Sequence, residues 1–116
     1  MAKKRRRVAP PPLPTEWDFT YLDMTAEEGW LQLCQQAPGP SRTAYEQIRR
    51  EPRRRSDPDR QHRLRYECST KTIGGLVLEQ WQYEVTGGSR VWYAIDDANR
   101  TVVMTHAGVG HPKQTD

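Results

Sequence analysis

The stretch LVLEQWQYEVTGGSRVWYAIDDANRTVVMTH, residues 76–106, decides the fold of this chain. Apolar and polar side chains alternate along most of it, which is the period of a half-buried β-strand. The glycine pair at 87–88 and the DDAN run at 96–99 are turn sequences. We therefore expect three consecutive antiparallel strands, over Leu76–Val85, Arg90–Ile95 and Arg100–His106.

The length of the hairpin loop determines which side chains share a face of this sheet. A two-residue loop would mix polar and apolar groups, so we expect the three-residue loop Gly87-Gly88-Ser89. The apolar face then carries Val77, Trp81, Tyr83, Val85, Val91, Tyr93 and Ile95. The opposite face carries Gln80, Gln82, Glu84, Arg90 and Trp92. We expect this second face to be open to solvent, with Trp92 exposed, and to hold the functional site.

The residues before this meander predict one more strand and a helix. Glu16–Leu22 alternates aromatic with polar side chains, which favours a strand. Thr25 and Glu28 have the spacing of a capping box, and a helix is expected from there until the prolines and glycine at 38–40. The order of elements so far is strand, helix, then strands.

A second helix and a basic loop are expected between these parts. Ser41 is placed to cap the helix, which closes at Pro52. Its inward side chains would be Ala44, Tyr45 and Ile48, and its outward ones Arg42, Arg49 and Arg50. The run RRRSDPDRQ, residues 53–61, reads as a mobile basic loop. Alternation over His62–Cys68 predicts another strand with a charged face.

The first fourteen residues, MAKKRRRVAPPPLP, join a charge block to a proline run. Such a composition cannot bury apolar area, so we expect residues 1–14 to be a disordered basic arm. Residues 15–116 are then one domain of the α+β class, with two N-terminal helices on one face of a small, mainly antiparallel, twisted sheet.

Composition excludes several classes of protein. No window of about 18 apolar residues could span a bilayer, so no membrane partner is expected and the protein should be cytoplasmic. Cys34 and Cys68 are too few for a disulfide framework and are expected to be reduced thiols. His62, His106 and His111 lack the spacing of zinc ligands, so neither a metal nor a cofactor is expected.

The net charge of +3 hides a segregation along the chain. Residues 1–7 carry +5, residues 8–41 carry −5, residues 42–65 carry +5, and the remainder carries −2. Fourteen of the eighteen basic residues are arginines, whose planar guanidinium suits bidentate phosphate contact. Clustered arginine is the usual footprint of a nucleic-acid partner, although a solvated basic surface has the same composition.

The two predicted helices, the basic loop and the run EQWQYEVTGGSRVWYAIDDANRTVVMTHAGVGHPK, residues 79–113, resemble the RelE/ParE-type bacterial toxins of type II toxin–antitoxin systems. The most specific part is SRVWYAIDD followed by an apolar strand and a short basic tail. The resemblance implies a RelE-like fold and a cognate antitoxin as partner. Toxins of the RelE branch cleave ribosome-bound messenger RNA without metal, whereas those of the ParE branch inhibit DNA gyrase.

The resemblance also implies roles for individual residues. Arg90 takes the place of the family's phosphate-stabilising arginine, and the tail supplies His111 and Lys113, with His111 as general acid or base. Glu84 would act as base or orient Arg90, and Lys113 would assist Arg90 on the phosphorane. Contact with RNA would fall to Trp92, by stacking, and to the arginines Arg53, Arg54, Arg55, Arg63 and Arg65.

The RelE branch is favoured, and the sequence thus predicts an endoribonuclease that acts on messenger RNA. Two alternatives stay open: a ParE-like gyrase inhibitor without enzymatic activity, and a nucleic-acid-binding module without toxicity. Each site residue also has a plainer explanation. Arg90 and Glu84 could form a cross-strand ion pair, His111 could be a solvated tail residue, and His106 could be a core or rim histidine.

Overall fold

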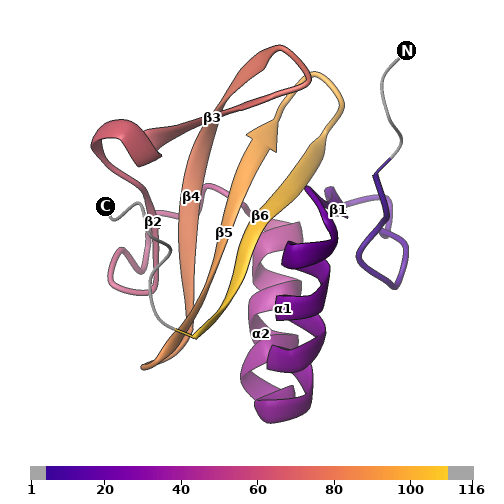
Figure 1. Cartoon of the computed structure of the whole chain (residues 1–116), viewed down its shortest axis with the longest axis vertical. Coiled ribbons are helices and arrows are strands. Elements are labelled where there is room, and N and C mark those ends of the chain that lie inside the picture. The colour runs from indigo at the N-terminus through magenta and orange to yellow at the C-terminus, as the bar shows by residue number, and fades with distance from the viewer. Residues whose placement is uncertain (1–4, 110–116) are drawn as a thin grey trace.

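The computed structural model describes residues 5–109 of the chain. Its elements are β1 (Asp18–Tyr21), α1 (Met24–Gln36), α2 (Pro38–Arg50), β2 (Gln61–Arg63), the 3-10 helix η1 (Tyr66–Ser69), β3 (Thr70–Ile73), β4 (Leu76–Thr86), β5 (Ser89–Asp96) and β6 (Thr101–Val109). Both α-helices pack on the same face of one twisted sheet (Figure 1). The α+β class, the two N-terminal helices and the three-strand meander are confirmed.

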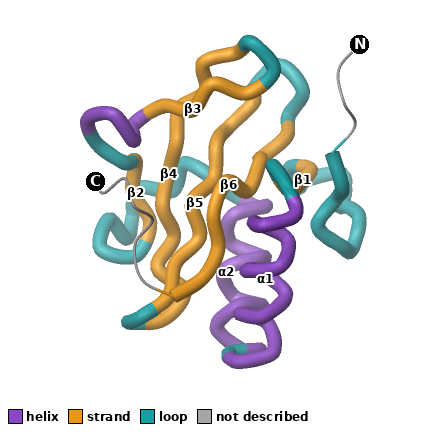
Figure 2. The backbone as a smooth tube through the Cα atoms, viewed as in Figure 1, coloured by secondary structure: helices purple, strands orange, loops and turns teal. Residues whose placement is uncertain are grey.

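The strands follow the order β1-β6-β5-β4-β2, and β3 also pairs with β4, along the same edge as β2. All pairs are antiparallel except β1 with β6, which is parallel. The first strand of the chain thus lies beside the last one (Figure 2). The core between helices and sheet is built largely from aromatic residues, among them Phe19, Trp30, Tyr45, Trp81 and Tyr93.

The hairpin between β4 and β5 sorts its side chains as expected, but by a different device. Glu84 lies opposite Arg90, whereas Thr86 lies opposite Ser89, so the turn itself has only two residues. The register shifts at Val85, where a β-bulge takes up one extra residue. The expected three-residue loop is wrong, and the two faces come out as predicted because a bulge changes the alternation just as a longer loop would.

Val77 departs from the expected core face. Its side chain is 68% exposed. It lies in the β3–β4 hairpin, which extends past the ends of both helices (Figure 1). The alternation assigns it to the correct face of the strand, but no helix covers that face at this level.

The helix starts differ from the sequence prediction. Asp23, not Thr25, caps α1, and its carboxylate accepts from the backbone N–H of Ala26 at 2.9 Å. α2 begins at Pro38, a residue suited to the first turn because its missing N–H would have no intrahelical partner there. Ser41 is therefore inside the helix, where its hydroxyl donates to the carbonyl of Leu33 in α1 at 3.2 Å.

The prediction of a disordered arm is wrong for residues 5–14, and residues 1–4 lie outside the described part of the chain. Val8 is 0% exposed, and its N–H donates to the carbonyl of Phe19 at 2.7 Å. Arg7 forms a bridge with Thr20 and a bidentate ion pair with Asp18. The segment is ordered because β1 offers free backbone groups at the sheet edge and Val8 has a core to enter.

Arg49 was expected to point outward from α2, and this is also wrong, because it is 0% exposed. Its Nε donates to the carbonyl of Trp17 at 3.0 Å, and its Nη1 donates to the carbonyl of Pro10 and to the Tyr45 hydroxyl. The guanidinium therefore joins the N-terminal segment, the start of β1 and α2. Two main-chain carbonyls provide the polar partners that make the burial of this charge possible.

The continuous strand expected over His62–Cys68 is wrong as well. Only β2 pairs there, and Tyr66 then takes a positive φ of 56° and starts η1. This change of direction leaves Tyr66 exposed, while Leu64 and Cys68 turn onto the sheet. Among residues 5–109, no helix is long and apolar enough to cross a membrane.

Candidate functional site

The face of the sheet away from the helices, called here the open face, carries a row of four side chains in register. His62 lies opposite Gln82, Gln82 opposite Trp92, and Trp92 opposite His106. The Trp92 indole N–H donates to Oε1 of Gln82 at 2.9 Å, and Nε2 of Gln82 lies 3.4 Å from Nε2 of His62. The row therefore crosses the sheet from β2 to β6.

Trp92 was expected to be exposed, and this is wrong. Its side chain is only 4% exposed, because Leu64 and Cys68 pack against it. His106 makes an edge contact with the indole, at a centroid distance of 6.1 Å. A ring enclosed in this way has no face on which an RNA base could stack, so the stacking role proposed from the sequence loses its geometric basis.

Glu84 and Arg90 form the next row towards the β4–β5 turn. They lie directly opposite each other, and both are half-buried. The structure holds no ion pair between them, so the plain explanation of these residues as a cross-strand salt bridge is not supported. Nε of Arg90 is buried and has no hydrogen-bond partner within residues 5–109. The sheet thus presents a half-buried cation that no carboxylate of the described residues neutralises at close range.

His106 joins this face through a second β-bulge, which sequence reasoning missed. Trp92 pairs with His106 but Tyr93 pairs with Met104, so Thr105 is the extra residue in β6. Strict alternation from Met104 would have put His106 on the helix face. The bulge turns it instead towards Trp92, the side chain that follows Arg90 on the same face of β5.

The tail residues predicted to be catalytic, His111 and Lys113, lie outside the described residues. The last described part of β6 places Gly108 opposite Arg90. The chain therefore leaves β6 beside Arg90, and His111 follows Gly108 by three residues in the sequence.

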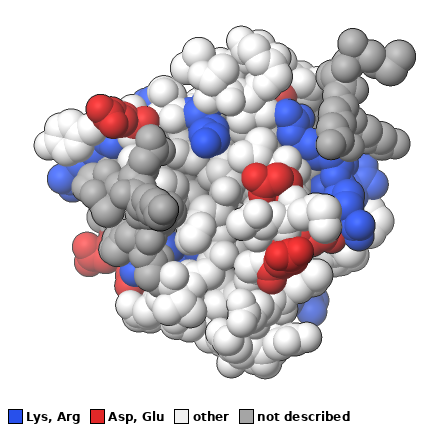
Figure 3. Space-filling view, viewed as in Figure 1, with Lys and Arg blue, Asp and Glu red and all other residues white. Residues whose placement is uncertain are grey.

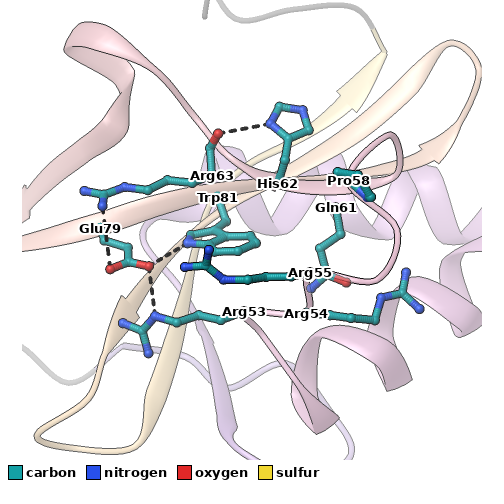
Figure 4. A pocket seen from close by; sticks show the side chains of 9 residues that line it. All are labelled: Arg53, Arg54, Arg55, Pro58, Gln61, His62, Arg63, Glu79 and Trp81. Atoms are coloured by element: carbon teal, nitrogen blue, oxygen red, sulfur yellow. Dashed lines mark hydrogen bonds and ion pairs between the residues drawn. The ribbon is translucent and has the colours of Figure 1, made fainter.

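Arg53, Arg54 and Arg55 of the 53–61 loop and Arg63 of β2 line a second feature, which we call the basic cleft (Figure 4). It is a hollow of about 510 Å³ bordered by Arg53, Arg54, Arg55, Pro58, Gln61, His62, Arg63, Glu79 and Trp81. The loop forms one wall, and β2 with the outer part of β4 forms the other. Elsewhere, on the face shown in Figure 3, basic side chains form separate groups with acidic ones between them, so no single basic surface dominates that view.

Arg53 acts as a clamp and not as a free cation. Its Nε donates to Glu79 at 2.8 Å, while Nη1 and Nη2 donate to the two carboxylate oxygens of Asp97, also at 2.8 Å. These hydrogen bonds lower the pKa of Asp97 and raise the pKa of Arg53. Burial raises the pKa of Glu79, but hydrogen bonds from Arg53 and the Trp81 indole outweigh it, so the net shift is downward. All guanidinium nitrogens of Arg53 are thus engaged.

Three of the other arginines predicted to contact RNA are less engaged. Arg55 is exposed and forms no ion pair with any described residue. Arg54 approaches only Asp57, at 3.9 Å, and its buried Nε has no hydrogen-bond partner in the described part of the chain. Arg63 is exposed; it lies 3.9 Å from Glu79, and its Nε and Nη2 donate to the carbonyl of Ser69 at 3.4 and 3.3 Å. Arg65 is exposed as well. Within residues 5–109, no three His, Cys, Asp or Glu side chains gather as a metal site requires.

Comparison with known proteins gives a likeness among the solved structures. No protein-family model and no curated protein matches the sequence. A solved structure does match: a chain in the crystal structure of the toxin–antitoxin complex RelBE2 from Mycobacterium tuberculosis. The identity is 21% and the TM-score 0.51, over 82% of this chain and 99% of that chain. The likeness supports the RelE-like α+β fold that the sequence predicted.

Proposed function

We propose that the protein is the toxin of a toxin–antitoxin pair and cleaves messenger RNA without a metal ion, at the open face around Arg90. The observation that carries the proposal is the state of Arg90 itself. It is half-buried on a rigid strand, and its Nε is not committed to any described partner. A preorganised cation of this kind stabilises the charge that develops on a phosphorane. The RelE-like fold and its likeness to a chain of a toxin–antitoxin complex support a toxin and an antitoxin partner.

The proposed reaction is attack by a ribose 2′-hydroxyl on the adjacent phosphorus. A base removes the 2′ proton, the bond from phosphorus to the 5′-oxygen breaks, and an acid protonates that oxygen. The products are a 2′,3′-cyclic phosphate and a free 5′-hydroxyl. Arg90 would stabilise the pentacovalent phosphorane, with Lys113 beside it, and Glu84 would accept the 2′ proton.

The acid would be a histidine at the β6 end of the open face. His111 follows the strand that passes Arg90, and His106 lies on the same face in contact with Trp92. An imidazole suits this role because its ordinary pKa of about 6.5 allows proton exchange near neutrality. Substituting His106 and His111 one at a time, and measuring the cleavage rate of each variant, shows which of them supplies the proton.

The test is cleavage of purified RNA and of cellular transcripts after brief expression. Arg90→Ala should lower the cleavage rate about 10² to 10³ fold, as the loss of one preorganised charge does elsewhere. Arg42→Ala is the matched control, because Arg42 is exposed on α2 and, among residues 5–109, forms an ion pair with Glu46 alone. EDTA should leave the rate unchanged. Full toxicity of Arg90→Ala with no new 5′ ends, together with inhibited DNA supercoiling, would replace this proposal by gyrase inhibition. Binding without either effect would leave a nucleic-acid-binding module.

A further inference from the structure

The basic cleft lies on the helix side of the sheet, away from Arg90. Arg63 pairs with Trp81, and Trp81 belongs to the core beneath the helices. Gln61 pairs with Tyr83, which belongs to the same core. Since side chains alternate between the faces of a strand, these groups and Arg90 point to opposite sides of the sheet. The cleft is therefore separate from the open face, and His62, on the open-face side of β2, marks the boundary between them.

The loop that carries the arginines is held in place by contacts at both of its sides. The Tyr93 hydroxyl donates to the carbonyl of Pro52 at 2.7 Å, and the clamp of Arg53 follows immediately in the sequence. At the other side, the N–H of Gln61 donates to the carbonyl of Asp57 at 2.9 Å. Arg54 and Arg55 are thus presented by a loop that is already ordered, which reduces the entropy lost when a ligand binds.

The charge inside the cleft is positive after its own ion pairs are counted. Glu79 is the one carboxylate among the described residues that line it, and this group already accepts from Arg53 and from the Trp81 indole. Arg55 has no acidic partner among the described residues, and Arg63 is 3.9 Å from Glu79. Cations held near one another without close counter-ions favour a ligand that brings negative charge.

The floor of the cleft adds an unused acceptor. Gln61 is 1% exposed, and its Nε2 donates to the carbonyls of Glu51 and Pro52 and to the Tyr93 hydroxyl. These bonds fix the amide so that Oε1 remains on the other side, and Oε1 has no hydrogen-bond partner within residues 5–109. Figure 4 shows Gln61 among the side chains that line the cleft, together with Arg54 and Arg55. A buried acceptor without a donor calls for a ligand that brings an N–H or O–H group.

We propose that the basic cleft binds one phosphorylated nucleotide, with the phosphate between Arg54, Arg55 and Arg63 and an N–H or O–H group of the base or sugar directed to Gln61. A hollow of about 510 Å³ is within the range of sites that hold a small ligand, and its position under a loop excludes a duplex. The nucleotide can be free or part of a single strand. The inference rests on the proposed function where it takes that strand to be RNA flanking the cleaved bond.

The experiment measures binding separately from cleavage. A fluorescent 12-nucleotide RNA with 2′-O-methyl groups, which cannot attack its own phosphate, is titrated with the full chain over a salt series. Arg55→Ala combined with Arg63→Ala should weaken binding about 10 to 100 fold and reduce the salt slope by about 0.7 for each phosphate that the variant no longer neutralises. Arg42→Ala removes an exposed arginine outside the cleft and should change binding less than about twofold.

Competition identifies the source of the nucleotide. Displacement of the RNA by AMP, but not by inorganic phosphate at the same ionic strength, indicates that a mononucleotide suffices. Displacement only by unlabelled RNA indicates a strand, and both results support the site. Binding by the double variant equal to that of Arg42→Ala, with thermal midpoints unchanged, would overturn it. Cleavage of unmodified RNA decides the proposed function independently, because the Arg90 variant can lose cleavage while the cleft still binds.

Discussion

Replacing Arg49 with methionine should release the N-terminal segment from the domain. The buried guanidinium donates to the main-chain carbonyls of Trp17 and Pro10 and to the Tyr45 hydroxyl. Methionine has a comparable apolar stem but donates no hydrogen bond. The carbonyl of Trp17 would then lose this donor, and that of Pro10 would keep only the Tyr45 hydroxyl, at 3.0 Å.

The size of the effect follows from these hydrogen bonds. A hydrogen bond from a charged donor contributes about 1.5 to 3 kcal/mol. Part of this cost is recovered, because Nη2 of Arg49 is buried without a partner within residues 5–109 and its removal relieves a desolvation penalty. We expect the free energy of unfolding to fall by about 2 to 4 kcal/mol, which for a domain of this size lowers the thermal midpoint by about 8 to 16 °C.

Calorimetry and limited trypsin digestion measure the two consequences. The Arg49→Met protein should show the lower midpoint and faster cleavage after Arg5, Arg6 and Arg7. The control is Arg50→Met, because Arg50 is the next residue of α2 and is exposed. A midpoint within about 3 °C of the wild type, together with unchanged trypsin cleavage, would refute the idea that Arg49 fastens the segment.

Three further predictions concern other parts of the fold. The pKa of Asp97 in the folded state is lowered beside Arg53, so the ionised carboxylate stabilises the fold above the ordinary pKa of 3.8, and this stabilisation is lost as the pH falls below it. Denaturation curves of Asp97→Asn should therefore match those of the wild type at about pH 2 and show lower stability at about pH 7. A Cβ at Gly29 would lie 2.0 Å from a backbone carbonyl oxygen of β6, so Gly29→Ala should lower the unfolding free energy by at least about 2 kcal/mol, whereas Gly39→Ala, with open space around it, should not. Trp92→Ala should cost about 3 to 5 kcal/mol in chemical denaturation, and a loss of RNA affinity with unchanged stability would contradict its enclosed position.

Local periodicity in the sequence was sufficient to predict the central part of the fold. The strands β4, β5 and β6 follow one another with short turns, so alternation and turn residues between them determine the pairing. That Glu84 and Arg90 share a face could be predicted for the same reason, since the face of a strand residue depends only on parity and on the loop. Their direct opposition could not, because the expected three-residue loop would have placed Trp92 opposite Glu84. The bulge at Val85 preserved that parity, which is why an error in loop length did not move Arg90.

Positions that depend on distant segments could not be predicted in this way. Trp92 is enclosed by residues 64–69, and this needs the positive φ of Tyr66, for which the sequence has no glycine as a signal. Arg49 is buried by carbonyls from segments that lie more than 30 residues earlier in the chain. Arg53 meets Asp97 across 44 positions. In each case the sequence alone predicts a surface group, because the residues that bury or pair with it are distant in the chain.

The parallel pairing of β1 with β6 has a consequence for the time course of synthesis. Phe19 lies opposite Val102, so some 80 residues must be made after β1 before its partner strand exists. At about 5 to 20 residues per second, this delay is on the order of 4 to 16 seconds. During that interval β1 and the segment on its edge have no strand to join, and α1 lacks the β6 surface on which it packs. A nascent chain that stops before residue 101 therefore cannot close its sheet, and the finished fold arises only when the last strand is complete.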